Sequence, residues 1–87
     1  MRYRIEFTST ALRDLRALPR NVQRRIDARI LALADNPRPP GVKKLADTEC
    51  LYRLRVGDYR VVYQILDDRL IIVVVRLGHR REVYRNL

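Results

Sequence analysis

Residues 51–66 decide the fold, and they read LYRLRVGDYRVVYQIL. Polar and apolar residues alternate on both sides of Gly57-Asp58, a pattern that predicts two antiparallel strands joined by a two-residue turn. Such a turn fixes the register of the hairpin. It pairs Val56 with Tyr59, Leu54 with Val61 and Tyr52 with Tyr63, and these pairs share one apolar face.

The other face of the hairpin carries cations. The same register places Arg55 directly opposite Arg60, with Arg53 two positions along the strand. Because like charges directly opposite each other destabilise a sheet, we expect this face to be open to solvent and to hold an anion. The alternative for Arg53 and Arg55 is that they are outward charges of an edge strand, which discourage aggregation.

The composition is that of one folded, strongly basic domain. The 87 residues suffice for one modest core, and 47% of them are apolar. The net charge is +9, and all but two of the 19 cationic residues are arginine. Arginine suits bidentate contacts to phosphate, so a polyanionic partner such as RNA, a ribosome surface or an acidic protein is expected. A solvated basic surface is the simpler alternative.

Several function classes are disfavoured by residues that are rare or missing. The longest apolar run covers residues 70–75, far short of the ~20 residues of a membrane span, and residues 1–7 resemble a strand rather than a signal peptide. We expect a cytoplasmic protein with no membrane partner. A single cysteine, Cys50, excludes an internal disulfide, and a single histidine, His79, argues against a metal site. No cofactor is expected.

The rest of the chain predicts an α+β fold in one domain, residues 1–87. An alternating strand at residues 1–7 leads through a cap among Thr8, Ser9 and Thr10 into a helix that Pro19 ends. Asn21 is expected to cap a second helix, whose apolar stripe repeats every three or four residues. The two helices form a hairpin on one sheet face. The last three strands, at residues 51–56, 59–66 and 70–75, form an antiparallel meander, and the third is central or covered on both faces.

A set of six side chains is the candidate site. Arg53, Arg55 and Arg60 lie on the open sheet face, and His79, Arg80 and Tyr84 follow the last strand, so we expect them to converge. Such a set fits RNA cleavage by attack of the ribose 2′-OH on the adjacent phosphorus. Arginines would stabilise the phosphorane, histidine would serve as acid or base, and tyrosine would stack on a base or relay a proton.

Other readings of these residues stay open. His79 could be an ordinary loop residue, and Tyr84 could pack its ring against the sheet. Lys43 and Lys44 could contribute to RNA binding or remain solvated, and Arg81 would add to the RNA-binding charge.

The sequence resembles the RelE branch of the RelE/ParE toxin superfamily over almost its whole length. The resemblance is carried by residues 59–65 (YRVVYQI), by Asp67-Asp68 with the apolar strand after it, and by residues 78–84 (GHRREVY). Residues 3–7 (YRIEF), 11–15 (ALRDL) and 36–38 (NPR) also fit.

The resemblance implies a ribosome-dependent endoribonuclease that cuts the mRNA codon in the A site without a metal. It also implies a short acidic antitoxin that wraps the basic surface, and contact with operator DNA only through the antitoxin complex. The family arginine that stabilises the phosphate falls on Arg60, the arginine after the last strand on Arg80, and the tail tyrosine on Tyr84.

Two positions depart from the family pattern, because Arg53 and Arg55 stand where relatives have lysines. Arginine does not give up its proton in proteins, so a role as base does not pass to either residue. His79 or Tyr84 would then move the proton. Two further readings remain: a ParE-like inhibitor of DNA gyrase, and an inactive module that binds only an antitoxin.

Overall fold

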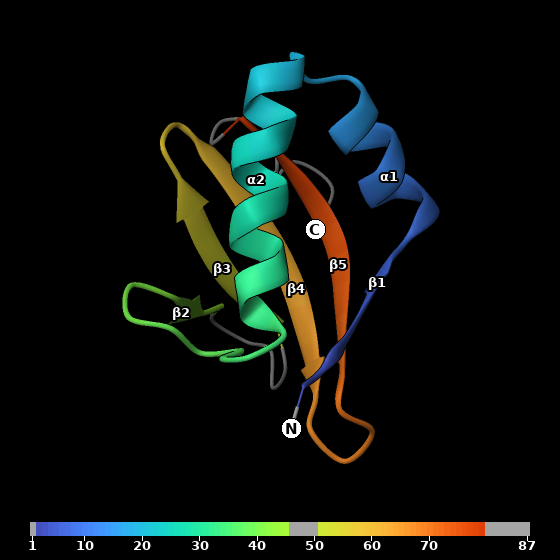
Figure 1. Cartoon of the computed structure of the whole chain (residues 1–87), viewed down its shortest axis with the longest axis vertical. Coiled ribbons are helices and arrows are strands. Elements are labelled where there is room, and N and C mark those ends of the chain that lie inside the picture. The colour runs from blue at the N-terminus through green and yellow to red at the C-terminus, as the bar shows by residue number, and fades with distance from the viewer. Residues whose placement is uncertain (1, 46–50, 80–87) are drawn as a thin grey trace.

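The computed structural model describes residues 2–45 and 51–79. Within them, a five-stranded sheet in the order β1-β5-β4-β3-β2 is covered on one face by two helices (Figure 1). The elements along the chain are β1 (Arg4–Phe7), α1 (Ser9–Arg16), α2 (Arg20–Leu33), β2 (Lys43–Lys44), β3 (Leu51–Val56), β4 (Tyr59–Leu66) and β5 (Ile71–His79). The predicted α+β class, helical cover and meander are confirmed, with β2 as an additional short edge strand.

The hairpin of β3 and β4 has the predicted register at every predicted pair, including Arg55 opposite Arg60. Gly57 has φ +60°, a left-handed conformation that the two-residue turn requires and that glycine adopts without strain. The strand predicted at residues 70–75 runs further, to His79. It lies between β4 and β1, and β1 pairs with it in parallel.

The core lies between the helices and the apolar face of the sheet. The predicted stripe of α2 is buried in full (Val22, Ile26, Ile30 and Leu33). It packs with the inward residues of the sheet, which include Leu54, Val61, Tyr63, Ile72 and Val74. In Figure 1, α2 crosses in front of the sheet and α1 lies beside β5 and β1. Neither helix is long and apolar enough to cross a membrane.

The helix ends differ in part from the predictions. Thr8 caps α1, because its side-chain oxygen accepts from the Ala11 N–H at 3.1 Å. Asn21 was expected to cap α2, and this is wrong. Pro19 holds the cap position, and its carbonyl accepts the first helical bond from the Gln23 N–H at 2.9 Å. A proline suits this boundary because it offers no N–H that would need a partner.

Asp14 on α1 completes the edge of β5 where β1 has ended. β1 pairs with β5 only as far as Val74, and the register of β5 against β4 shifts near this level. Beyond it, the Asp14 carboxylate accepts from the Leu77 N–H at 3.1 Å and from the Arg76 Nε at 2.8 Å. Because the Asp14 and Arg76 side chains are only 18% and 19% exposed, this contact replaces a strand partner in a partly dry site.

Replacing this carboxylate should therefore destabilise the protein. D14A leaves the Leu77 N–H and the Arg76 guanidinium without their acceptor, and we expect the free energy of unfolding to fall by about 1–3 kcal/mol. D14N is the matched control, because its amide oxygen can still accept from Leu77 while the charge is lost. Urea unfolding should rank wild type above D14N and D14N above D14A. Equal stability of D14A and wild type would contradict this role of Asp14.

A polar cluster ties the proline-rich loop to the opposite end of the sheet. The Arg38 guanidinium donates twice to the Asp67 carboxylate, at 2.8 and 3.3 Å, and lies 5.2 Å from the centre of the Tyr52 ring. The Tyr3 hydroxyl donates to the same carboxylate at 2.6 Å. The Tyr63 hydroxyl donates to the Pro37 carbonyl at 2.7 Å, and burial raises the pKa of Tyr63. These contacts anchor the loop to the sheet at Pro37 and Arg38.

This cluster predicts an acid-sensitive contribution to stability. The hydrogen bonds from Arg38 and then Tyr3 lower the pKa of Asp67 to about 2. The carboxylate stabilises the fold above its unfolded-state pKa of about 4, and this stabilisation is lost as the pH falls from about 4 through about 2. Thermal melts should show D67N less stable than wild type at neutral pH, with the gap closing over that window. A gap that stays constant down to the lowest pH would contradict the assignment.

Candidate functional site

Apart from Arg76, which lies opposite Val62 and pairs with Asp14, the sheet face turned away from the helices carries four cations from three adjacent strands. Residues directly opposite in a sheet share a face, so the pair Arg55–Arg60 and the pair Lys43–Arg53 lie on the same side, opposite to the side of Leu54 and Val61. We call this surface the cationic face, and it comprises Lys43, Arg53, Arg55 and Arg60. The three arginines share this face, as the hairpin register predicted.

Lys44 does not belong to this face. It pairs with Tyr52, whose ring stacks at 5.9 Å on the buried Tyr63 on the helix side of the sheet. Since successive residues of a strand point to opposite sides, Lys43 and Lys44 are separated by the sheet. Of the two predicted RNA-binding lysines, the register places only Lys43 beside the arginines.

Arg60 is not open to solvent, which corrects the prediction for this residue. It is only 5% exposed, whereas Arg55 is exposed and Arg53 is half-buried. It lies on β4, the middle strand of the five, with a hydrogen-bonded strand on each side. One Nη atom donates to the Tyr59 carbonyl at 3.4 Å. Arginine keeps its charge even when buried, so Arg60 presents a fixed cation with limited freedom of movement.

Beside Arg60, the last strand leaves room. The residue opposite Arg60 on β5 is Gly78, and a Cβ placed there would meet no atom of the described residues within 4 Å. The register partners of Arg60 are therefore a long cation on β3, Arg55, and a glycine on β5, Gly78. A glycine inside a strand often marks a place where a ligand or another backbone approaches closely.

His79 was expected to converge with the arginines, and this is wrong. It pairs with Tyr59, and their rings meet edge to face at 6.0 Å with an angle of 82°. This pair lies on the helix side, because the register alternates and Gly78 takes the position opposite Arg60. His79 and Tyr59 line a cavity of about 230 Å³ together with Asp14, Leu18 and Arg76.

Three predicted site residues, Arg80, Arg81 and Tyr84, lie outside the described residues. Their roles stay predictions. Among residues 2–45 and 51–79, no group of three or more histidine, cysteine or acidic side chains could hold a metal ion. The described part of the site is thus a set of fixed positive charges, whose chemistry is to bind and stabilise an anion.

Sequence reasoning missed the ion pair of Arg76 with Asp14, which closes the cavity beside His79. The two residues are 62 positions apart, and no local pattern connects them. A second signal was present but not used: Lys43 and Lys44 continue the alternation of the hairpin, so only one of them could share the face of Arg53.

Comparison with known proteins gives the family. A family model described as the ParE toxin of the type II toxin-antitoxin system, parDE, matches residues 5–84. A putative RelE-like toxin protein of Escherichia coli is 35% identical over 81 residues, which cover 92% of this chain and 85% of the relative. The mRNA interferase toxin RelE of Escherichia coli K12 is 30% identical, over 97% of this chain and 92% of the relative.

Solved structures agree with the sequence relatives. The RelE–RelB complex from Pyrococcus horikoshii OT3 matches with a TM-score of 0.82 at 32% identity, covering 95% of this chain and all of that chain. The RelBE2 toxin-antitoxin complex from Mycobacterium tuberculosis matches with a TM-score of 0.81 at 30% identity, covering 92% of this chain and all of that chain. The fold and charge define a small basic toxin domain. The chain belongs to the RelE/ParE superfamily and is a RelE-like toxin of the type II toxin–antitoxin class.

The neighbouring lysines offer a matched test of the cationic face. In salt titrations with an RNA of about six nucleotides whose 2′-hydroxyls are methylated, K43A should reduce the slope of log affinity against log salt by about 0.7, the value for one lost phosphate contact. K44A removes the same charge from the next residue, on the other side of the sheet, and should leave the slope unchanged. Equal slopes of log affinity against log salt for K43A and K44A would contradict the assignment of RNA binding to the cationic face.

Proposed function

We propose that this chain is a RelE-type endoribonuclease, which cuts mRNA in the ribosomal A site by attack of the ribose 2′-OH on the adjacent phosphorus. The observation that carries the proposal is the opposition of Arg55 and Arg60 on the cationic face, where the β5 residue opposite Arg60 is Gly78. Two cations held directly opposite each other cost stability unless an anion joins them. Two relatives at 30% identity bear the name mRNA interferase.

In this mechanism the arginines act on the phosphate. Arg60 is buried and fixed, so it would hold the scissile phosphate with little reorganisation as charge develops on the phosphorane. Arg55 is exposed and would approach the same phosphate from β3. Arg53 and Lys43 would bind neighbouring phosphates and set the position of the strand.

The proton transfers fall to other groups. Neither Arg55 nor Arg60 can take the 2′ proton, because the pKa of arginine lies far above neutral pH. Since His79 points to the helix side, Tyr84 becomes the residue of the predicted set to test in this role. A ring of cations would favour its ionised form. Arg80 and Arg81 would add further positive charge after β5.

The proposed protein partners follow from the charge and from the relatives. Several structural neighbours are RelB–RelE complexes, and an acidic antitoxin would neutralise a surface of net charge +9. Ribosome and mRNA would meet the same positive surface before neutralisation. Contact with operator DNA would occur through the toxin–antitoxin complex.

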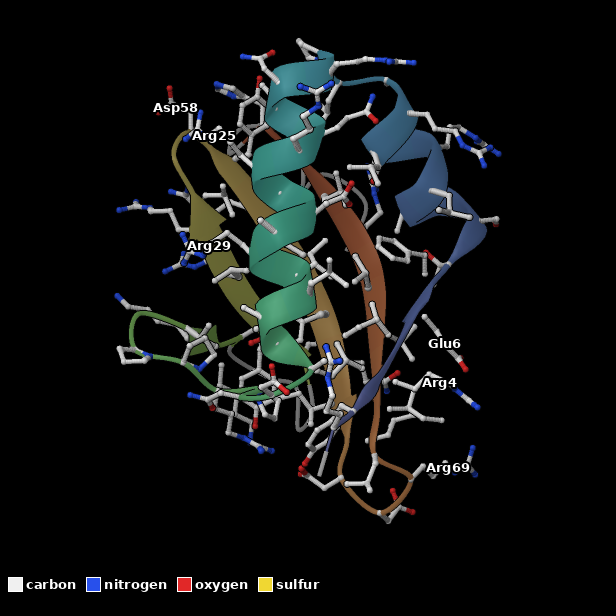
Figure 2. All side chains as sticks on the ribbon, in the orientation of Figure 1. Arg4, Glu6, Arg25, Arg29, Asp58 and Arg69 are labelled. Atoms are coloured by element: carbon white, nitrogen blue, oxygen red, sulfur yellow. The ribbon has the colours of Figure 1, made fainter. Side chains whose placement is uncertain are left out.

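Cleavage of ribosome-bound mRNA tests the proposal directly. We expect R60A to lower the cleavage rate on programmed ribosomes by about 10²–10³-fold, the usual effect of removing one group that stabilises developing charge, and R55A to lower it as well. R69A is the matched control, because Arg69 lies in the exposed turn between β4 and β5, at the other end of the sheet (Figure 2). Thermal melts and the R60K variant separate loss of the cation from loss of folding.

Two outcomes would contradict the proposal. If R55A and R60A cut like wild type, the assigned residues are wrong. If wild type stops growth but leaves messages intact, and blocks supercoiling by purified gyrase, the chain is a ParE-like inhibitor, the reading that the family description also allows. A chain that does neither, while binding its antitoxin, is an inactive binding module.

A further inference from the structure

Two arginines of α2, Arg25 and Arg29, form a second basic surface on the other side of β3. They are four residues apart and therefore lie on one flank of the helix. The Nη2 atom of Arg25 lies 3.0 Å from the point where a Cβ would stand on Gly57, so this flank faces the turn between β3 and β4. Figure 2 shows both side chains extending from α2 toward β3, with Arg25 beside the turn.

Between this flank and the cationic face lies the edge of β3. The Leu51 carbonyl accepts from the Leu45 N–H on the β2 side, so the backbone groups of Arg53 and Arg55 point to that side as well. β2 begins only at Lys43, opposite Arg53, and does not extend along β3 to Arg55. The N–H of Arg55 therefore lies on an edge that no described strand covers. Backbone N–H groups at such an edge can donate to phosphate oxygens.

The described acidic residues make their ion pairs with other cations. In the described part of the chain, ion pairs join Arg2 to Asp35, Arg4 to Glu6, Arg38 to Asp67 and Arg76 to Asp14. None of them involves Arg25, Arg29, Arg53 or Arg55. Asp58 lies near Arg25 in the turn, without an ion pair within 4 Å (Figure 2). The edge of β3 thus has, on each of its two sides, arginines that make no ion pair with a described acidic residue.

We propose that Arg25 and Arg29 bind the phosphates of an RNA strand that passes around the uncovered edge of β3. The strand is held at Arg55 and Arg60 on one side, crosses the edge beside the Arg55 N–H, and continues on the flank of α2. This track rests on the proposed RNA-cutting function for its starting point. The track adds a substrate preference to that function, because the protein would bind RNA more tightly when the RNA extends beyond the few nucleotides around the cut.

The length dependence of binding tests the track. The probes are RNAs of about three and about 12 nucleotides with methylated 2′-hydroxyls, which cannot be cut by 2′-OH attack, so binding is measured apart from chemistry. For the longer RNA, R25A/R29A should reduce the slope of log affinity against log salt by about 1.4, and the affinity at low salt roughly tenfold. For the short RNA, R25A/R29A should bind like wild type.

Two control variants make the result specific. R13A/R16A removes the same charge from exposed positions of α1, beside β5 and away from β3, and should bind the longer RNA like wild type. R25K/R29K keeps the charge and should retain most of the affinity, which separates phosphate binding from any role of Arg25 in holding the turn. Thermal melts of all variants report folding.

The outcomes distinguish the track from the proposed function. The track is overturned if R25A/R29A binds the longer RNA like R13A/R16A, if both probes lose affinity equally, or if wild type does not favour the longer RNA. Cleavage of programmed ribosomes by wild type is measured in parallel. If that cleavage is seen while any of these binding results is obtained, the track fails and the proposed function stands.

Discussion

The two-residue turn at Gly57-Asp58 is the constraint on which the rest of the structure depends. Side chains alternate along a strand, so a turn longer or shorter by one residue would send every side chain of one strand to the opposite face. Arg55 or Arg60 would then point under α2, and a core residue such as Leu54 or Val61 would point away from the helices. The left-handed φ of Gly57 thus fixes both the core and the cationic face.

The cationic face costs stability that the opposite face of the same strands offsets. The positively charged Arg55 and Arg60 lie directly opposite each other in the hairpin, and the side chain of Arg60 is buried. Neither arginine can relieve this repulsion by losing a proton, because arginine stays charged in proteins. On the helix side, β3 and β4 contribute Leu54, Val61 and Tyr63 to the core, each at most 2% exposed. A sheet with one dry, well-packed face can carry unfavourable charges on the other.

The sequence predicts those features of the fold that arise from local patterns. Alternation around a turn predicted the hairpin register residue by residue, and helical spacing predicted the buried stripe of α2. Features that depend on distant segments were not predictable in this way. The place of β4 in the middle of the sheet depends on strands far apart in the chain, and the edge of β5 is completed by Asp14, 63 residues away from Leu77.

The same distinction applies to the site. Arg53, Arg55 and Arg60 were predicted correctly as neighbours on one face, because their placement needs only the register of one hairpin. His79 was placed wrongly, because its side depends on where β5 ends and on which residue stands opposite Arg60. The family resemblance gave the residue positions of a site, whereas the alternation of β5 decides which side of the sheet each residue faces.

The distribution of ion pairs gives the molecule a polarity that composition alone does not show. Arg2 pairs with an acidic residue in the loop after α2, Arg4 with one on β1, and Arg38 with one in the turn between β4 and β5. These cations are therefore partly neutralised. On both sides of the edge of β3, Arg25, Arg29, Arg53 and Arg55 make no ion pair with a described acidic residue. A net charge of +9 spread evenly would attract any polyanion weakly and in many orientations. Arginines on both sides of one edge would favour one orientation of the proposed RNA strand, the one that brings a phosphate to Arg55 and Arg60.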